Sequence, residues 1–276
     1  MSLELLVVEI DDDVQGEAWT VKDLNVLSKI IAVITLGQAQ HAARIIAQLE
    51  PLAPALSHAD LFAGARGQLR IKGDTESKRD VSRHHRDGFL FECISWIVAR
   101  NQNLMGAYLK DPHISATSQG LDGLMIQINE AGTGIKSATI FEDKCTNSPR
   151  DKFRDEVMPT FTAHHENRRS RELVANAVSL LKESGLDATA ATRAAAAILS
   201  KEFRNYRAAL TVGNGYKTAG KRKDLFKGYN LLGGITKSQR IGAVFIFDGD
   251  LRDWFEKLAS GATLKLHDFQ AGGIDV

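Results

Sequence analysis

The sequence predicts an α/β protein with an N-terminal α/β extension, a central pair of strands and a helical C-terminal half. Residues 120–128 are typical of a strand, and after the turn-rich segment 129–134 a second strand follows, in which side chains alternate between two faces at period two over 138–145. Two such strands joined by a short glycine-containing loop are typical of an antiparallel hairpin. Apolar residues at helical spacing precede this pair and follow it after Pro149.

The first part of the chain contains a short strand and one or two helices. Residues 3–10 are an apolar run typical of a strand, and residues 20–49 repeat apolar side chains at helical spacing. The polar stretch 66–88 carries almost no periodic signal, so we expect a linker or loop there. The chain therefore divides into an N-terminal extension, 1–85, and a second unit, 86–276.

The second unit begins with a buried helix. Residues 89–109 are mostly apolar and end before Asp111-Pro112, and Glu92 lies in the first turns of this expected helix. Further helices are expected after the strand pair, followed by one compact strand and a last helix. They are the helices 153–161, 171–181 and 188–206, the strand 241–247 and the helix 251–258.

Composition is that of an ordinary globular protein of 276 residues, with 43% hydrophobic and 25% charged residues. The longest apolar run, 30–36, is far shorter than the roughly 18 to 20 residues that cross a bilayer, so no membrane span is expected. The first residues lack the basic region of a secretory signal, and Cys93 and Cys145 lack the spacing of a zinc site or a disulfide framework. We therefore expect a cytoplasmic protein.

The predicted hairpin ends in a charged cluster. Glu142 and Lys144 are two residues apart on one strand and therefore point to the same face. A turn centred on Gly132 places Asp122, on the first strand, opposite Glu142. The segment 76–78 (Glu-Ser-Lys) has the same spacing, but it lies in a polar stretch and is expected to be a solvated loop.

Carboxylates beside a lysine can hydrolyse a phosphodiester. Asp and Glu oxygens hold Mg²⁺ through one or two carboxylates, and water and phosphate oxygens complete the coordination. The ion polarises the phosphoryl oxygen and activates a bound water, while the lysine orients that water or stabilises developing charge. The alternative is a set of ion pairs that only stabilises the strand ends, in a non-catalytic nucleic-acid-binding or interaction subunit.

The order of these residues resembles the PD-(D/E)xK nuclease superfamily. The resemblance covers about 88–146, with the strand at 241–247 as a completing element. It implies a restriction-endonuclease-like core, which is a mixed sheet flanked by helices. It also implies a Mg²⁺-dependent deoxyribonuclease in which Mn²⁺ can substitute; double-stranded DNA is the favoured substrate and RNA stays open.

The same resemblance implies roles for four residues. Asp122 and Glu142 would bind the metal, Lys144 would be the catalytic lysine, and Glu92 would be the additional carboxylate that many members carry on a helix. The sequence departs from the motif in one place, because Leu121 stands where the name-giving proline would be.

More narrowly, the chain resembles the nuclease subunit of Hachiman-type bacterial anti-phage defence systems. The resemblance spans most of the chain and includes FLFECISW, GLDGLMIQ and IFEDKCT. It implies a helicase partner subunit with ATPase activity that restrains the nuclease until phage-associated DNA damage is sensed. The extension 1–85 is then the natural place to look for the partner-binding region.

Basic residues cluster in the second half of the chain, although the net charge is only +1. Five of them are candidate contacts to nucleic acid, with solvated surface as the alternative for each: Arg204, Arg207, Lys217, Lys221 and Arg222. The segment 215–222 matches most of a phosphate-binding G-x-x-x-x-G-K loop. Arg222 stands where that loop needs Ser or Thr, which argues against an ATPase.

Overall fold

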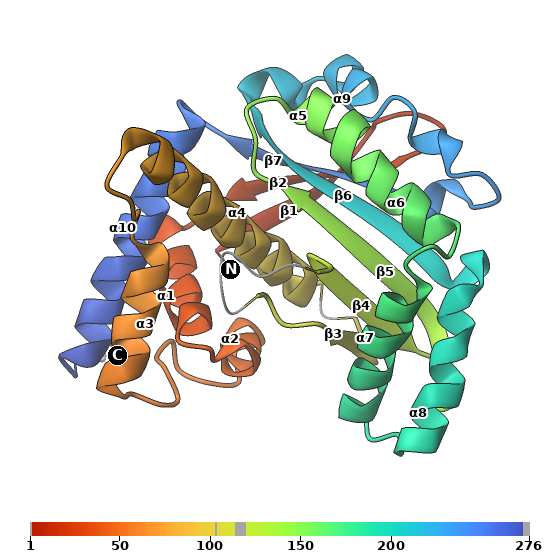
Figure 1. Ribbon diagram of the computed structural model, residues 1–276, viewed down its shortest axis with the longest axis horizontal. Helices are drawn as coiled ribbons and strands as arrows, with labels where there is room; N and C mark the ends of the chain where they lie inside the picture. Colours follow the sequence, from red (N-terminus) through yellow and green to blue (C-terminus); the bar gives the residue numbers. More distant parts are fainter. Residues whose placement is uncertain (1, 103, 114–119, 273–276) are drawn as a thin grey trace.

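The computed structural model describes residues 2–102, 104–113 and 120–272, which form one mixed sheet with helices on both faces (Figure 1). The seven strands lie in the order β1-β2-β7-β6-β5-β4-β3. The four central strands are parallel, and the strands at both edges pair antiparallel. The strands are β1 (Leu3–Val8), β2 (Gln15–Val21), β3 (Ala107–Leu109), β4 (Gly123–Ile128), β5 (Ile135–Lys144), β6 (Arg204–Gly213) and β7 (Arg240–Phe247).

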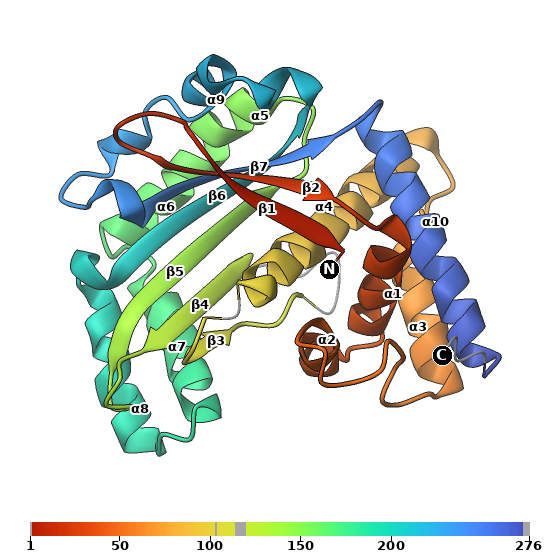
Figure 2. The ribbon, with the colours of Figure 1, turned by 180° about the vertical axis from the view of Figure 1, so that it is seen from behind.

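The helices form two layers. On one face α4 crosses the sheet, and four further helices pack beside it (Figures 1 and 2). These five are α1 (Leu24–Thr35), α2 (Ala39–Ile46), α3 (Ala59–Leu69), α4 (Glu76–Asn101) and α10 (Leu251–Gln270). The other face carries α5 (Pro149–Lys152), a π-helical turn (Phe153–Val157), α6 (Met158–His165), α7 (Ser170–Glu183), α8 (Ala188–Ala195) and α9 (Ala219–Leu225).

Short 3₁₀ turns complete the connections. They are Ala196–Leu199, Lys201–Phe203, Asn214–Lys217, Tyr229–Leu231 and Lys237–Gln239. Within the described ranges, no helix combines the length and the apolar composition that crossing a membrane requires.

The central strands are buried on both faces, because helices cover both sides of a parallel sheet. In β6 the run from Tyr206 to Val212 is buried throughout. Burial on both faces explains why β6, which begins with basic residues, continues as Ala-Ala-Leu-Thr-Val over 208–212. Side chains of both helical layers pack against this part of the strand. One apolar core therefore lies on each side of the sheet.

Several expected elements differ from the structure. Residues 15–21 form the strand β2, so the helical region expected from residue 20 begins only at Leu24, and β2 pairs parallel with β7, near the other end of the chain. The stretch 66–88, expected to be a loop, contains the end of α3 and the first half of α4. The boundary expected at residue 85 falls inside α4. That helix ends at Asn101 rather than 109 and is followed by the strand β3.

The helix expected over 188–206 is shorter in the structure. Residues 188–195 form α8, but β6 begins at Arg204, so the end of the expected helix 188–206 is strand. The C-terminal half is therefore not purely helical, since it supplies the two central strands β6 and β7.

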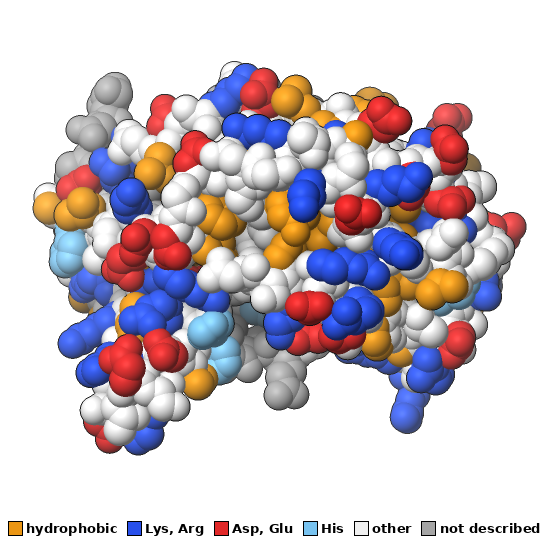
Figure 3. Space-filling view, turned by 90° about the horizontal axis from the view of Figure 1, so that it is seen from above, with side chains coloured by type: hydrophobic (Ala, Val, Ile, Leu, Met, Phe, Trp, Pro, Cys, Tyr) orange, Lys and Arg blue, Asp and Glu red, His pale blue; other side chains and the backbone are white. Residues whose placement is uncertain are grey.

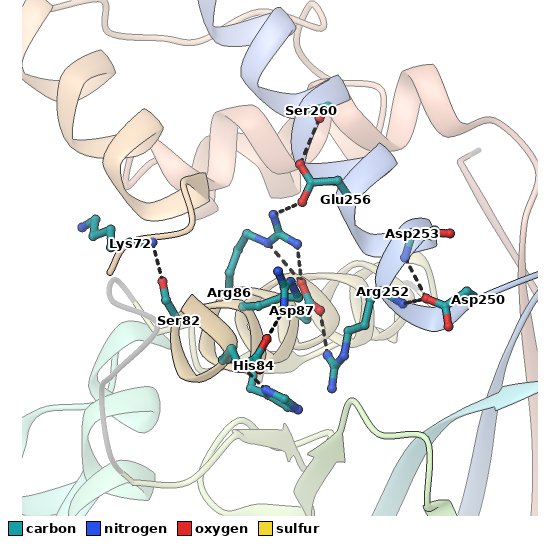
Figure 4. Close-up of polar contacts among 12 residues, drawn as sticks. Lys72, Ser82, His84, Arg86, Asp87, Asp250, Arg252, Asp253, Glu256 and Ser260 are labelled. Atoms are coloured by element: carbon teal, nitrogen blue, oxygen red, sulfur yellow. Dashed lines mark hydrogen bonds and ion pairs between the residues drawn. The ribbon is translucent and has the colours of Figure 1, made fainter. Parts of the chain in front are cut away.

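Buried ion pairs fix α4 against α10 (Figure 4). Asp87 is fully buried, and its Oδ1 accepts from the guanidinium of Arg86 at 2.8 and 3.0 Å. Its Oδ2 accepts from Nη1 of Arg252, on α10, at 2.7 Å. Arg86 also pairs with Glu256 of α10. These contacts hold α4 and α10 together beside the end of β5, where Arg252 and Cys145 line the same cavity.

Asp87→Ala should destabilise the protein strongly, because it leaves Arg252 without its carboxylate and buried Arg86 with only the half-exposed Glu256. Breaking a buried pair in this way costs about 3 to 5 kcal/mol. Urea unfolding measures the loss. The matched control is Asp268→Ala, also on an α10 contact but in a half-exposed pair with Lys265, where a change below about 1 kcal/mol is expected. Equal effects of the two substitutions would contradict this role of Asp87.

Candidate active site

The β4–β5 hairpin has the register that a turn centred on Gly132 predicts. Gly123 pairs with Phe141, and Gln127 pairs with Ser137. Gly132 itself has a positive φ of 69°, which glycine adopts without strain. The prediction that the residue before Gly123 lies beside the charged end of β5 therefore agrees with the register.

Two contacts hold Asp122 at the end of β5. Its Oδ2 accepts a hydrogen bond from the backbone N–H of Asp143 at 2.9 Å. The next residue, Gly123, lies against the ring of Phe141, and a Cβ at Gly123 would be 2.5 Å from a ring carbon. A larger residue at position 123 would push β4 away from β5, so the placement of Asp122 depends on this glycine.

Asp122, Glu142 and Lys144 meet at this point. Nζ of Lys144 lies 2.6 Å from Oε1 of Glu142 and 3.6 Å from Oδ2 of Asp122. Glu142 is buried, while about a quarter of the side chains of Asp122 and Lys144 stays exposed. Three of the four predicted site residues are thus brought together, with one edge of the cluster open to solvent.

Burial and neighbouring charge change the pKa values of this cluster. Burial and, to a smaller extent, the negative charge of Asp122 raise the pKa of Glu142 to about 7, against the opposing effect of Lys144. For Lys144, burial disfavours the ammonium, but Asp122 and Glu142 outweigh it and raise its pKa above the usual value. The lysine therefore stays charged at neutral pH, while Glu142 can gain or lose a proton.

Two residues of the cluster border a cavity of about 900 Å³ between α4 and the segment that follows β5, and Glu142 lies behind them as the buried partner of Lys144. Asp122 and Lys144 line it together with Glu92, from α4. Glu92 is not bonded to the cluster; it accepts from the backbone N–H of His113 at 2.8 Å and pairs with the His113 ring at 3.0 Å. Glu92 thus shares the cavity with the other predicted residues but is held by a different partner.

Asp143 and His113 are cavity residues that the sequence analysis did not select. Asp143 points to the α4 side of the sheet, opposite to Glu142, and only 3% of its side chain is exposed. Its Oδ1 has no hydrogen-bond partner, and burial raises its pKa to about 7. The available signal was an acidic residue on the apolar face of a strand, between Phe141 and Cys145. No sequence pattern marked His113.

Arg204 and Arg207, predicted to contact nucleic acid, are both buried. Arg204 donates to the backbone oxygens of Ile198 and His164. The guanidinium of Arg207 stacks over Phe141, 3.6 Å from the ring centre. Such enclosed side chains offer no surface to a phosphate, so these two predictions do not fit the structure. Their physical role is to bind backbone oxygens and to support the end of β5.

The remaining three candidates lie around the start of α9. Lys217 and Lys221 are exposed, so both can reach a ligand in solution. Arg222 is buried instead and donates to the backbone oxygens of Glu9, Tyr216 and Lys217. Its guanidinium therefore closes the turn before α9 rather than facing solvent. The segment 214–225 follows β6 at the sheet edge where β5 also ends, and α9 packs against α5.

The donor set suits a hard divalent cation. Mg²⁺ binds proteins through one or two carboxylates and keeps several waters or phosphate oxygens, so Asp122 and Glu142 are sufficient ligands. In the parts of the chain that the structure describes, no three His, Cys, Asp or Glu side chains form a ready cage for a metal. An ion here would therefore rely on water and substrate oxygens for most of its coordination.

The raised pKa of Glu142 predicts a pH-dependent contribution to stability. Because the folded protein holds this proton more tightly than the unfolded chain, ionisation of Glu142 costs stability as pH rises from about 5 through 7. Glu142→Gln cannot ionise, so it should gain up to roughly 3 kcal/mol relative to wild type over that range. Urea unfolding at stepped pH, without added metal, measures the difference.

The control is Glu166→Gln, an exposed carboxyl that pairs with Arg168. It should follow the wild-type pH profile. If Glu142→Gln also followed it, Glu142 would have an ordinary pKa and would not be part of a buried charged cluster.

Comparison with known proteins identifies no relative: no family model, no curated protein and no solved structure matches this chain. The resemblance to PD-(D/E)xK nucleases therefore stays a prediction. We infer function from the residues and from the geometry of the cavity.

Proposed function

We propose that this protein is a Mg²⁺-dependent DNA nuclease with a restriction-endonuclease-like core. One observation carries the proposal: Lys144 lies 2.6 Å from Glu142 and 3.6 Å from Asp122 at the edge of a 900 Å³ cavity. Paired carboxylates and a lysine on one hairpin are the set that phosphodiester hydrolysis needs. Asp122 and Lys144 line the cavity, and Glu142 is joined to it through its ion pair with Lys144. The raised pKa of Glu142 supports the proposal, because perturbed ionisable groups favour a functional site.

Each residue of the cluster has a separate task in this proposal. Asp122 and Glu142 would hold Mg²⁺, or Mn²⁺ in its place; the bound ion supplies polarisation of the phosphate and a water of lowered pKa. The ammonium of Lys144 holds its proton at neutral pH and donates a hydrogen bond to the attacking water or to a phosphate oxygen. The backbone N–H of Asp143 keeps the carboxylate of Asp122 oriented.

The resemblance to the Hachiman nuclease subunit adds a biological role and a partner to the proposal. By that resemblance the chain is the effector of a bacterial anti-phage defence system, acting in the cytoplasm on double-stranded DNA. A helicase partner would restrain it, since a nuclease inside its own cell must be kept inactive. The extension 1–85 would carry part of the partner surface. Its strands β1 and β2 join the sheet beside β7, so the extension and the catalytic unit share one sheet.

A second candidate function is a non-catalytic interaction subunit. It is favoured by the close approach of Lys144 to both carboxylates, which is also how a stabilising ion cluster is arranged. Binding of a divalent cation distinguishes the two functions, because a nuclease must open the Lys144–Glu142 pair to admit the ion whereas a structural cluster keeps it closed.

Cleavage of supercoiled and linear DNA in Mg²⁺ or EDTA tests the nuclease directly. We expect wild type to require the metal and Lys144→Ala to lose at least about 10²-fold in rate, as for other donors to developing charge. The matched control is Lys78→Ala, from the second Glu-x-Lys pair, which lies exposed in the first turn of α4. Cleavage that needs no metal and is equal in all three proteins would contradict the proposal.

A further inference from the structure

The cavity beside the cluster has a second wall that the proposed catalytic residues do not explain. It is the side of α4 next to Asp87, whose partner Arg252 of α10 also lines the cavity (Figure 4). Residues four apart on this helix lie in one row, and the row facing the cavity contains Asp80, His84, Gly88 and Glu92. The row runs from exposed residues at the rim to the buried Glu92 at the floor.

Gly88 is the unusual member of this row. Glycine in the interior of a helix is less stable than alanine, and Gly88 does not have the positive φ that would require it. Packing does not require it either, because a Cβ at Gly88 would meet no atom within 4 Å. By contrast, Gly261 of α10 is needed for packing, since its Cβ would lie 2.6 Å from Oγ of Ser28. Gly88 keeps space open in the cavity wall.

Hydrogen-bond donors flank this open space at the rim. His84 and His85 come from α4, and both are exposed. Asn147, Ser148 and Lys152 come from the opposite side, where β5 leads into α5. Lys152 pairs there with Glu156, which also lines the cavity, and Arg252 adds a guanidinium from α10. Figure 3 shows histidine side chains beside a hollow on this face, with Lys, Arg, Asp and Glu side chains around it. The rim can therefore bind an anionic chain from two sides.

The floor of the cavity is acidic, in contrast to the hydrogen-bond donors at its rim. Three carboxylates, those of Glu92, Asp122 and Asp143, line it together with the ammonium of Lys144. An anionic phosphate reaches carboxylates only with a cation between them, whereas the rim can hold phosphates with its own donors. An acidic floor and a rim of donors suit a nucleic-acid backbone, in which one phosphate lies at the floor and the neighbouring phosphates lie at the rim.

We infer that one nucleic-acid strand crosses α4 at Gly88, with its backbone in the space that the missing side chain leaves open. Phosphates on either side of the reacting one bind at the rim, to His84 and His85 of α4 and to Lys152 opposite. The inference rests on the proposed nuclease function and adds the path of the substrate. The cavity volume of about 900 Å³ is at the upper end of the range for ligand sites, as a polymer segment requires.

Substitutions of Gly88 are expected to change the thermal stability and the DNA affinity in opposite directions. Gly88→Ala and Gly88→Leu should raise the thermal midpoint of unfolding, because both residues favour helix over glycine and the space is free. Gly88→Leu should weaken binding of a labelled DNA duplex, measured by fluorescence anisotropy in Ca²⁺, by about ten-fold or more, since it blocks the backbone path. Gly88→Ala should give a smaller loss.

Gly64 provides the matched control. It also lies inside a helix, α3, and a Cβ there would meet nothing within 4 Å, but it does not line the cavity. Gly64→Leu should raise the thermal midpoint and leave DNA affinity unchanged. Wild-type affinity in a folded Gly88→Leu variant would overturn the inference.

The binding assay also keeps this inference distinct from the nuclease itself. If wild type binds DNA through Gly88 but cleaves none in Mg²⁺, the path of the strand stands and the nuclease fails. If DNA is cleaved, and Gly88→Leu binds and cleaves it as wild type does, the nuclease stands and the path is wrong.

Discussion

The register of the β4–β5 hairpin is the constraint on which the candidate site depends. It places Gly123 under the ring of Phe141 and the carboxylate of Asp122 against the backbone N–H of Asp143. A shift by one residue would turn every side chain of β5 to the other face of the sheet, and Glu142 and Lys144 would then point toward α4. The proposed chemistry therefore follows from a local turn and one glycine, before any long-range contact is considered.

Charged groups on both faces of the sheet meet at the end of β5. On one face Lys144 pairs with Glu142. On the other, Asp143 lies 4.0 Å from Arg207, whose guanidinium is enclosed by the rings of Phe141 and Trp19. Burial of so many ionisable groups is costly, and the raised pKa values of Glu142 and Asp143 express that cost. A metal ion that took the place of the Lys144 ammonium beside Glu142 would stabilise the ionised carboxylate and so lower this cost.

The grouping of Asp122, Glu142 and Lys144 could be predicted because its determinants are local. Alternation at period two placed Glu142 and Lys144 on one face, and hairpin geometry placed Asp122 beside them. β2 was missed because the alternation in QGEAWTV is weak and its pairing with β7 joins residues more than 200 positions apart. The first half of α4 was missed because it is polar; Thr75 caps it, and α10 anchors it from far along the chain. The burial of Arg204 could not be predicted, because its hydrogen-bond acceptors are backbone oxygens of distant residues, and no sequence pattern indicates them.

The most direct test of the account is a crystal structure with Mn²⁺, in which anomalous scattering locates the ion. We predict one ion within coordination distance of carboxylate oxygens of both Asp122 and Glu142, with Nζ of Lys144 moved away from Glu142. An intact Lys144–Glu142 pair at saturating Mn²⁺, with no ion at these carboxylates, would contradict the catalytic role of the cluster and favour a structural one.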